Sequence, residues 1–236
     1  MRLRKGNHKV LVISDLQVPF HHPDAFSFLE EIKKEIKPTK IVCIGDSIDA
    51  YALGSYVRDP DSMSAGAEHR KAKEALKRLY DLFPNAIEVD SNHNNRVYRR
   101  AKEAGIPKTF LKDYAELLDS PWKFTERTVI DEVIYEHGDA FGGQTPHKCA
   151  TLSNMKSTVI GHHHCSSGIQ YVSTRERMLF GMNVGCLIDN SAYAFEYNKK
   201  YKFHPTLACG AVLYGVPKLI PMITGPKGRW SRELTV

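Results

Sequence analysis

The sequence has few cysteines, and none of them is spaced as a metal-binding or redox pair. Five are scattered over the 236 residues, at Cys43, Cys149, Cys165, Cys186 and Cys209. The odd number and the lack of a C-x-x-C pair argue against a disulfide framework, a structural zinc site and a dithiol redox motif. We therefore expect reduced thiols and a fold that is held together by its core.

Long hydrophobic runs are also missing. Those at residues 9–14 and 208–216 are among the longest, and both are far shorter than the roughly 20 apolar residues that cross a bilayer. The basic first residues lack the apolar segment of a signal peptide. The sequence thus predicts a cytoplasmic protein with no membrane partner.

Linkers and nucleotide-binding glycine motifs are absent as well. No low-complexity tract, internal repeat or stretch rich in proline, glycine or serine divides the chain, so one domain over residues 1–236 is expected. No P-loop, dinucleotide-binding glycine fingerprint or nucleophile elbow occurs, and the chemistries that depend on them are not indicated.

What the chain does contain is a basic balance and many histidines. Lysine and arginine number 33 against 27 acidic residues, which gives a net charge of +6 and a pI near 9.0. This charge is compatible with a polyanionic partner without establishing one. The 11 histidines are about twice the number that ordinary residue usage gives. Their positions decide what they mean.

Hydrophobic periodicity predicts alternating strands and helices in the first half of the chain. The strands are expected at residues 9–14, 40–44 and 86–90, and the helices at residues 24–36, 64–83 and about 95–104. This order predicts a largely parallel sheet with helices on its faces.

The second half reads instead as short strands with one helix. The strands are expected at residues 129–137, 157–161, 168–174, 177–184 and 209–216, and the helix at residues 146–155. A second, more antiparallel sheet packed on the first is the arrangement that this pattern favours.

Five short polar clusters each follow a predicted strand directly. They are Ser14–Gln17, Gly45–Asp49, Ser91–Asn94, His137–Asp139 and Gly161–His164. One such cluster alone is typical of a turn or a helix cap. Five of them should converge, because the carboxyl ends of strands meet in one crevice of an open sheet. Their carboxylates, amide oxygen and imidazoles suit Mn, Zn or Fe and exceed what one ion needs.

The order of these clusters resembles the motifs of the calcineurin-like metallophosphoesterases. That family carries Asp-x-His, Gly-Asp-x-x-Asp, Gly-Asn-His-Asp/Glu, a single His and Gly-His-x-His, and residues 15–164 follow this order. The rest of the chain is similar to branches found largely in phage genomes, which would place the protein in a host cytoplasm. The resemblance implies an α/β fold, a four-layer αββα sandwich of two mixed β-sheets flanked by helices.

The resemblance also implies two divalent metal ions, Mn foremost, with Mg, Zn, Fe or Ni as alternatives. The implied ligands are Asp15, Gln17 and His164 at the first ion, Asp46 between both, and Asn92, His137 and His162 at the second. His93 would stand near the scissile phosphate to stabilise charge or protonate the leaving oxygen, and Asp49 would orient ligands by hydrogen bonds. The side chain of His163 would point away from the two ions.

Three positions depart from the family pattern. Gln17 replaces a histidine, and its amide is a harder and weaker ligand that should shift preference from Zn toward Mn or Mg. Ser91 replaces a glycine, which is tolerable if that residue needs no positive φ. Asn94 replaces an acid; we expect it to keep the hydrogen bond to His93 without the charge, leaving His93 less readily protonated.

Basic and aromatic residues beside the clusters suggest how a substrate is held. Arg96, Arg99 and Arg100 fall on one side of a helix, either as a phosphate clamp or as a solvated face. Tyr51 and Tyr56 either stack on a base at the rim or serve as core or loop aromatics.

The sequence therefore predicts a hydrolase, a dinuclear metal-dependent phosphoesterase that uses metal-activated water. A phosphodiesterase acting on DNA, RNA or a nucleotide, that is, a nuclease-like enzyme, is the first hypothesis. The alternatives are a phosphomonoesterase, including a protein phosphatase, and a non-catalytic binding module on the same scaffold. The chain is expected to be a monomer or a homodimer.

Overall fold

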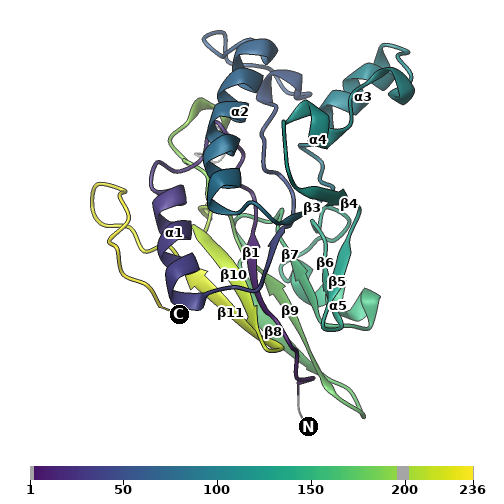
Figure 1. Cartoon of the computed structure of the whole chain (residues 1–236), viewed down its shortest axis with the longest axis vertical. Helices are drawn as coiled ribbons and strands as arrows, with labels where there is room; N and C mark the ends of the chain where they lie inside the picture. Colours follow the sequence, from purple (N-terminus) through teal and green to yellow (C-terminus); the bar gives the residue numbers. More distant parts are fainter. Residues whose placement is uncertain (1–2, 196–201, 236) are drawn as a thin grey trace.

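The computed structural model of the chain describes residues 3–195 and 202–235, whose strands form two sheets packed face to face (Figure 1). The six-stranded sheet has the order β11-β10-β1-β2-β3-β4. Its strands are β1 (Lys9–Ile13), β2 (Lys40–Cys43), β3 (Ile87–Val89), β4 (Lys123–Thr125), β10 (Ala208–Leu213) and β11 (Val216–Pro221). From β1 to β4 the strands are parallel, whereas β10 and β11 run antiparallel to their neighbours.

The five-stranded sheet has the order β5-β6-β7-β9-β8. Its strands are β5 (Thr128–Ile130), β6 (Val133–Tyr135), β7 (Thr158–Ile160), β8 (Gly168–Ser173) and β9 (Met178–Asn183). The three central strands are parallel and the two edge strands are antiparallel. Both sheets are therefore mixed, as the resemblance implied.

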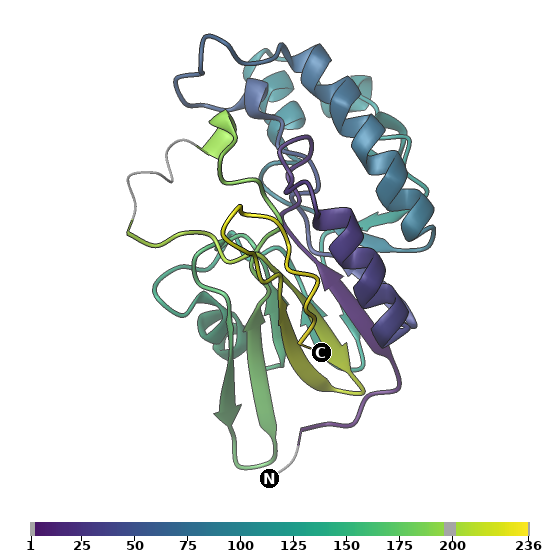
Figure 2. The ribbon, with the colours of Figure 1, turned by 90° about the vertical axis from the view of Figure 1, so that its left-hand side faces the viewer.

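Helices cover the outer faces of the two sheets, so the layers run helix, sheet, sheet, helix. The helices are α1 (Ala25–Ile36), α2 (Ala65–Leu82), α3 (Arg96–Glu103), α4 (Tyr114–Leu117) and α5 (Pro146–Asn154), with short 3-10 turns η1 (Tyr51–Leu53) and η2 (Lys108–Phe110). Figure 2 shows α1 and α2 on one side of the molecule. On the opposite side α5 lies directly on β9, where a Cβ added at Gly181 would come within 2.2 Å of the His147 carbonyl oxygen. The expected four-layer α/β sandwich is confirmed.

The alternation of strand side chains builds two cores at once. In β1, Leu11 and Ile13 join the core under α1 and α2, while Val10 and Val12 join the core between the sheets. This follows from the two-residue period of a strand, which turns successive side chains to opposite faces. Parallel strands that are buried on both faces read as continuous apolar runs, which is why the sequence revealed them.

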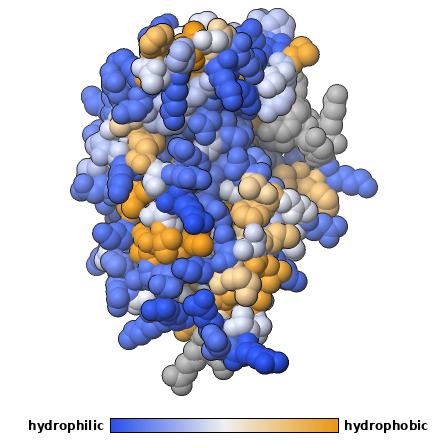
Figure 3. Space-filling model, turned by 90° about the vertical axis from the view of Figure 1, so that its right-hand side faces the viewer, coloured by the Kyte–Doolittle hydropathy of each residue, from blue (hydrophilic) through white to orange (hydrophobic). Residues whose placement is uncertain are grey.

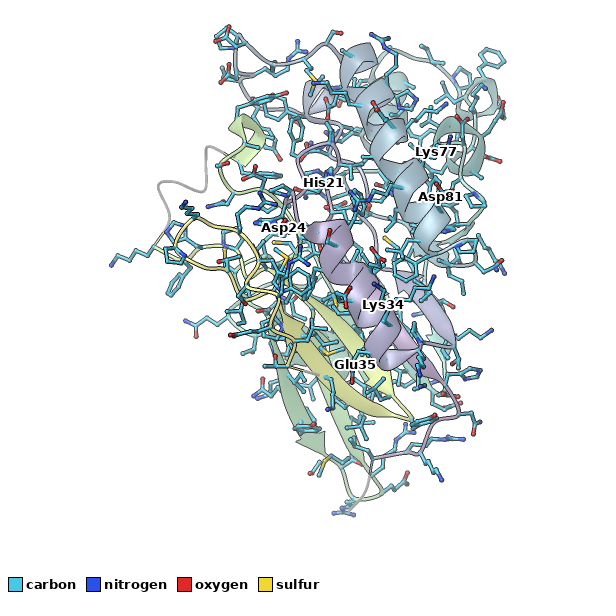
Figure 4. All side chains as sticks on the ribbon, turned by 60° about the vertical axis from the view of Figure 1, so that its left-hand side comes forward. His21, Asp24, Lys34, Glu35, Lys77 and Asp81 are labelled. Atoms are coloured by element: carbon cyan, nitrogen blue, oxygen red, sulfur yellow. The ribbon has the colours of Figure 1, made fainter. Side chains whose placement is uncertain are left out.

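The outer surface is polar where the helices face solvent. Lys34 and Glu35 point outward from α1, and Lys77 and Asp81 do so from α2 (Figure 4). The face in Figure 3 is likewise mainly hydrophilic and is interrupted by small apolar groups. In the described part of the chain we find no helix with the length and apolarity that a membrane span requires.

Two predictions about the second half of the chain were wrong. The strand expected at residues 129–137 is a hairpin, because Asp131 and Glu132 adopt left-handed φ values of 51° and 66° and form a two-residue turn between β5 and β6. The strand expected at residues 209–216 belongs to the first sheet, where β10 pairs with β1. It turns back at Tyr214 and Gly215 into β11, which was not expected.

Candidate metal centre

The five polar clusters meet at the carboxyl ends of β1, β2, β3, β6 and β7. The clearest contacts join three loops: His137 Nε2 lies 2.8 Å from Asn92 Oδ1 and 3.1 Å from His162 Nδ1. His162 Nδ1 is in turn 3.0 Å from Asn92 Oδ1. The convergence that strand order predicted is thus present in the structure.

Asp46 completes this first group of ligand atoms. Its Oδ2 lies 3.3 Å from His137 Nε2, and single ligand atoms of Asp46, His137 and His162 all fall within 4.8 Å of one another. Four donors around one transition metal, at bonds of about 2.1 Å, stand roughly 3 to 3.5 Å apart in a tetrahedral arrangement. The spacing of these atoms fits one divalent ion.

The imidazole of His137 is oriented for such an ion by its second nitrogen. His137 Nδ1 is 2.9 Å from the carbonyl oxygen of Ile44, an acceptor only, so Nδ1 carries the proton and donates. The other ring nitrogen, Nε2, then faces Asn92 and His162; Asp46 raises the pKa of the ring to about 10 despite burial, so an ion would bind at Nε2 in place of a proton. A backbone carbonyl that fixes the tautomer of a ligating histidine is a recurring feature of metal sites.

A second group of potential ligands, Asp15, Gln17 and His164, also reaches Asp46. His164 Nε2 is 3.0 Å from Asp15 Oδ1, and Gln17 Nε2 is 3.4 Å from Asp46 Oδ2. The other amide atom, Gln17 Oε1, is buried and has no hydrogen-bond partner. An oxygen in this condition is costly unless something binds it, and it is the atom with which Gln17 would ligate a cation.

The backbone at the ligand residues is strained. Asp15, Gln17, Asp46 and His162 all have left-handed φ values, between 47° and 64°. For residues other than glycine this conformation costs about 1–2 kcal/mol each. Strain of this kind gathers at functional sites, and here it turns four implied ligands toward one point.

Two glycines allow the loops to approach so closely. A Cβ added at Gly45, which has a φ of 93°, would lie 2.4 Å from the Ser91 Cβ. A Cβ at Gly161 would lie 1.9 Å from the Ser14 hydroxyl. Any side chain at either position would therefore push apart the loops that carry the ligands.

Charge in the site also suits a divalent cation. Burial alone would raise the pKa of the Asp46 carboxyl, but the neighbouring His137 and His93 hold it well below its ordinary value. The pKa of Asp15 is lowered as well, against burial, by the hydrogen bond and charge of His164. Two carboxylates, two amide oxygens and three imidazoles form the mixed oxygen and nitrogen set of Mn, Zn or Fe sites, so the residues fit the implied ions.

His93 stands beside this centre and is held by Asp49 and Arg96. Its Nδ1 is 3.0 Å from the carbonyl oxygen of Asp49, while Arg96 Nη2 lies 3.0 Å from its Nε2. Burial lowers the pKa of His93 to about 4; Asp46 opposes this shift and Arg96 adds to it. With Nδ1 donating and Nε2 accepting, the ring is neutral and offers no free proton.

Arg96 is the arginine that reaches the site. It is only 3% exposed, and Nη1 contacts both the carbonyl oxygen (2.9 Å) and Oδ1 (3.0 Å) of Asp49. Tyr56 adds its hydroxyl at 3.2 Å from Nη2 and places its ring beneath the guanidinium. Asp49 therefore positions Arg96 and His93 and contacts neither group of ligands.

The other two arginines do not join Arg96. Arg100 donates from Nε to the Leu53 carbonyl oxygen and also holds that of Gly54, which fixes η1. Arg99 is exposed, with Glu103 at 4.0 Å. The three arginines therefore do not point to one place: Arg96 reaches the site, Arg100 holds carbonyl oxygens at residues 53 and 54, and Arg99 faces solvent.

Asn94 differs from expectation, and Tyr51 takes the second of its two expected places. Asn94 donates to Glu88 Oε1 at 2.7 Å and makes no hydrogen bond to His93, because its side chain turns into the buried space behind the loop. Tyr51 is a core aromatic, packed edge-on against Phe20, and its hydroxyl accepts from the Asp59 amide. Asn94 thus lacks the expected contact with His93, whereas Tyr51 lines a small pocket together with Asp49, His93 and Arg96.

Two buried acids were missed by the sequence reasoning. Glu88, within β3, is fully buried and accepts from Ser47 and Asn94, the neighbours of two implied ligands. Glu68 of α2 is 3% exposed and accepts from the amides of Tyr51 and Ala52. An acid inside an otherwise apolar strand was the available signal for Glu88.

Comparison with known proteins gives distant structural likenesses. No family model and no curated protein matches the chain. Among solved structures, vacuolar protein sorting 29 from Cryptosporidium parvum is 16% identical, with 94% of each chain covered and a TM-score of 0.47. The E. coli phosphoesterase YfcE is 13% identical over 94% of this chain and 96% of that chain, with a TM-score of 0.46. A metallophosphoesterase from Sphaerobacter thermophilus is 14% identical over 87% and 84%, with a TM-score of 0.42.

The motif order and the two-sheet fold of this chain resemble those of the calcineurin-like metallophosphoesterases. The solved structures to which it is similar include both phosphoesterases and Vps29 proteins, at 10–16% identity. What the centre of this chain can do follows from its own residues.

Substitution of a single ligand should lower the number of bound metal ions by an amount that depends on the ligand. We expect the purified protein loaded with Mn to hold two ions, His137→Ala to hold one, and Asp46→Ala to hold fewer than one. The matched control is His163→Ala, because the His163 ring turns away to the Phe141 carbonyl oxygen. Plasma mass spectrometry after gel filtration measures the content. A wild-type protein with less than one ion in excess Mn would contradict this arrangement.

Glu88 should make stability depend on pH. Burial raises its pKa to about 7 although the hydrogen bonds from Ser47 and Asn94 lower it, whereas the unfolded chain ionises near 4.5. Since the folded state keeps this proton longer, the contribution of Glu88 to stability falls as pH rises from about 4.5 to 7. Glu88→Gln should therefore raise the free energy of unfolding at pH 8 and change it little at pH 4.

Urea unfolding in a chelator at both pH values tests this, with the exposed Glu126→Gln as control. The control should stay within about 0.5 kcal/mol of wild type at either pH. If Glu88→Gln changed the free energy of unfolding by the same amount at pH 8 and at pH 4, a buried protonated Glu88 would be excluded.

Proposed function

We propose that this protein is a metal-dependent phosphodiesterase that binds two divalent ions, Mn foremost, and cleaves phosphodiester bonds in nucleic acids or nucleotides. The observation that carries the proposal is the position of the Asp46 carboxylate. Its Oδ2 lies within 3.3 Å of His137 in one ligand group and within 3.4 Å of Gln17 in the other. A carboxylate shared between two sets of ligands is suited to a pair of ions.

The chain offers each ion its own set of ligands. One ion would be held by Asn92, His137 and His162, the other by Asp15, Gln17 and His164, with Asp46 between them. When bound, such ions lower the pKa of water and neutralise the charge of a phosphate. The amide of Gln17 stands where the family pattern has an imidazole. It therefore supports Mn or Mg over Zn at the ion held by Asp15, Gln17 and His164.

Arg96 supplies the fixed positive charge of the site. The guanidinium is charged at every accessible pH, and Asp49, Tyr56 and His93 hold it in one orientation. Donors that are fixed before the reaction stabilise the charge that develops on the phosphate or on the leaving oxygen. His93 serves here as an acceptor that orients Arg96, since both of its ring nitrogens are engaged.

Charge supports a nucleic acid or a nucleotide as the substrate. The chain carries a net charge of +6, and α3, which begins at the site, has four basic residues in eight. Positive residues beside a catalytic centre attract and orient polyanions.

Turnover of two chromogenic esters tests the proposal. The Mn-loaded protein should hydrolyse bis-p-nitrophenyl phosphate, and Asp46→Asn should abolish this activity. Arg96→Ala should lower kcat/KM by about 10²–10³-fold, the usual effect of removing one such donor, with the Mn content unchanged. Lys102→Ala, an exposed basic residue on the same helix, is the matched control and should behave as wild type.

Two outcomes would contradict the proposal and indicate a different function. Hydrolysis of p-nitrophenyl phosphate without that of the diester would make the protein a phosphomonoesterase. Full Mn binding with no hydrolysis of either ester, or of labelled DNA and RNA, would make it a binding module on the same scaffold.

A further inference from the structure

A large open cavity lies between the start of α5 and the start of β8. Its volume is about 930 Å³, and its lining comes from residues 143–145, His147, residues 165–170 and Phe203. Cys165 follows His164 directly in the chain, so the Cα atoms of this lining residue and of an implied metal ligand are about 3.8 Å apart. The opposite wall begins at Gly143. It is held to the loop that carries His164, because the carbonyl oxygen of Phe141, two residues before Gly143, lies 2.7 Å from His163 Nε2.

The described residues that line this cavity carry hydrogen-bonding groups but no formal charge. Those with polar side chains are Gln144, Thr145, His147, Cys165, Ser166, Ser167 and Gln170. Burial lowers the pKa of His147, so its ring is neutral as well. Without lysine or arginine the lining does not suit an isolated phosphate, and without carboxylates it does not suit a cation.

Several of these polar groups have no partner within the protein. Gln170 Oε1 and His147 Nδ1 are buried and make no hydrogen bond. Thr145 is the residue that precedes α5, yet its hydroxyl caps no amide of the helix. A bound molecule with both donors and acceptors would satisfy them.

Apolar surface complements the polar groups. Phe203 lines the cavity and is 74% exposed. An exposed aromatic ring beside uncharged donors and acceptors is the combination on which nucleobases stack and are recognised by their edges. The volume lies within the range of about 300–1,000 Å³ typical of small-molecule sites.

We propose that this cavity binds the nucleoside part, base and sugar, of the ester whose phosphate lies at the metal centre. The placement of the phosphate rests on the proposed phosphodiesterase function, whereas the recognition of the nucleoside rests on the cavity. The site thus makes the substrate a nucleotide or the end of a nucleic acid.

Binding of uncharged nucleosides to the metal-free protein tests the cavity apart from hydrolysis. Adenosine, guanosine, cytidine and uridine are titrated in a chelator, with methyl riboside and inorganic phosphate as comparison probes, and binding is followed by NMR chemical shifts. We expect at least one nucleoside to bind, and Phe203→Ala and Gln144→Trp to weaken it by about tenfold or more, the size of one lost stacking contact. Gln144 is exposed, so the larger side chain fills the cavity without entering the core.

Tyr171→Ala is the matched control. Tyr171 follows Gln170 in β8, is 50% exposed, and faces the other side of the strand, away from the cavity. This variant should bind nucleosides as the wild type does, although it too loses an exposed aromatic ring.

The outcomes separate the two proposals. Nucleoside binding that responds to the cavity variants, with no hydrolysis of any nucleotide, would uphold the cavity and overturn the phosphodiesterase. Hydrolysis of simple diesters with no nucleoside binding would uphold the phosphodiesterase and overturn the cavity. Binding of the riboside or of phosphate in place of nucleosides, or equal losses in Tyr171→Ala, would overturn nucleoside recognition.

Discussion

One carboxylate, that of Asp46, determines how the rest of the centre is arranged. Its Oδ1 accepts from the His93 amide, its Oδ2 lies beside His137 and Gln17, and its own amide donates to the Ser91 hydroxyl. The loop after β2 is thereby connected to those after β1, β3 and β6. A buried carboxylate is stable only when paired, and this requirement explains why so many loops converge on one residue.

The fold supplies the rigidity that this convergence requires. Four ligand residues hold left-handed backbone conformations, and the cost is met by the packing of the two sheets and the helices behind them. The loops are short and begin directly at buried strands, so each side chain has little freedom to move. A second shell of buried groups stands behind the ligands, with the Ile44 carbonyl at His137, and Glu88 at Ser47 and Asn94.

The sequence predicted those features that depend on residue type and strand order. Polar residues at the ends of apolar strands predicted where the loops would meet, because parallel strands share one edge. It did not reveal features that depend on the path of a loop. Arg96 and Arg100 are four residues apart and so share a helix face, yet Arg100 is taken up by carbonyls of η1, whose position no local pattern encodes. The sequence also did not predict the Asp131–Glu132 turn, because Asp tolerates a left-handed conformation but Glu rarely adopts one. The nucleoside cavity is assembled from three segments far apart in sequence.

Anomalous diffraction from crystals soaked in Mn would locate the two proposed ions. We expect two peaks, one among Asn92, His137 and His162, the other among Asp15, Gln17 and His164, with the Asp46 carboxylate between them. A single peak away from Asp46, or none at saturating Mn, would contradict the two-ion proposal.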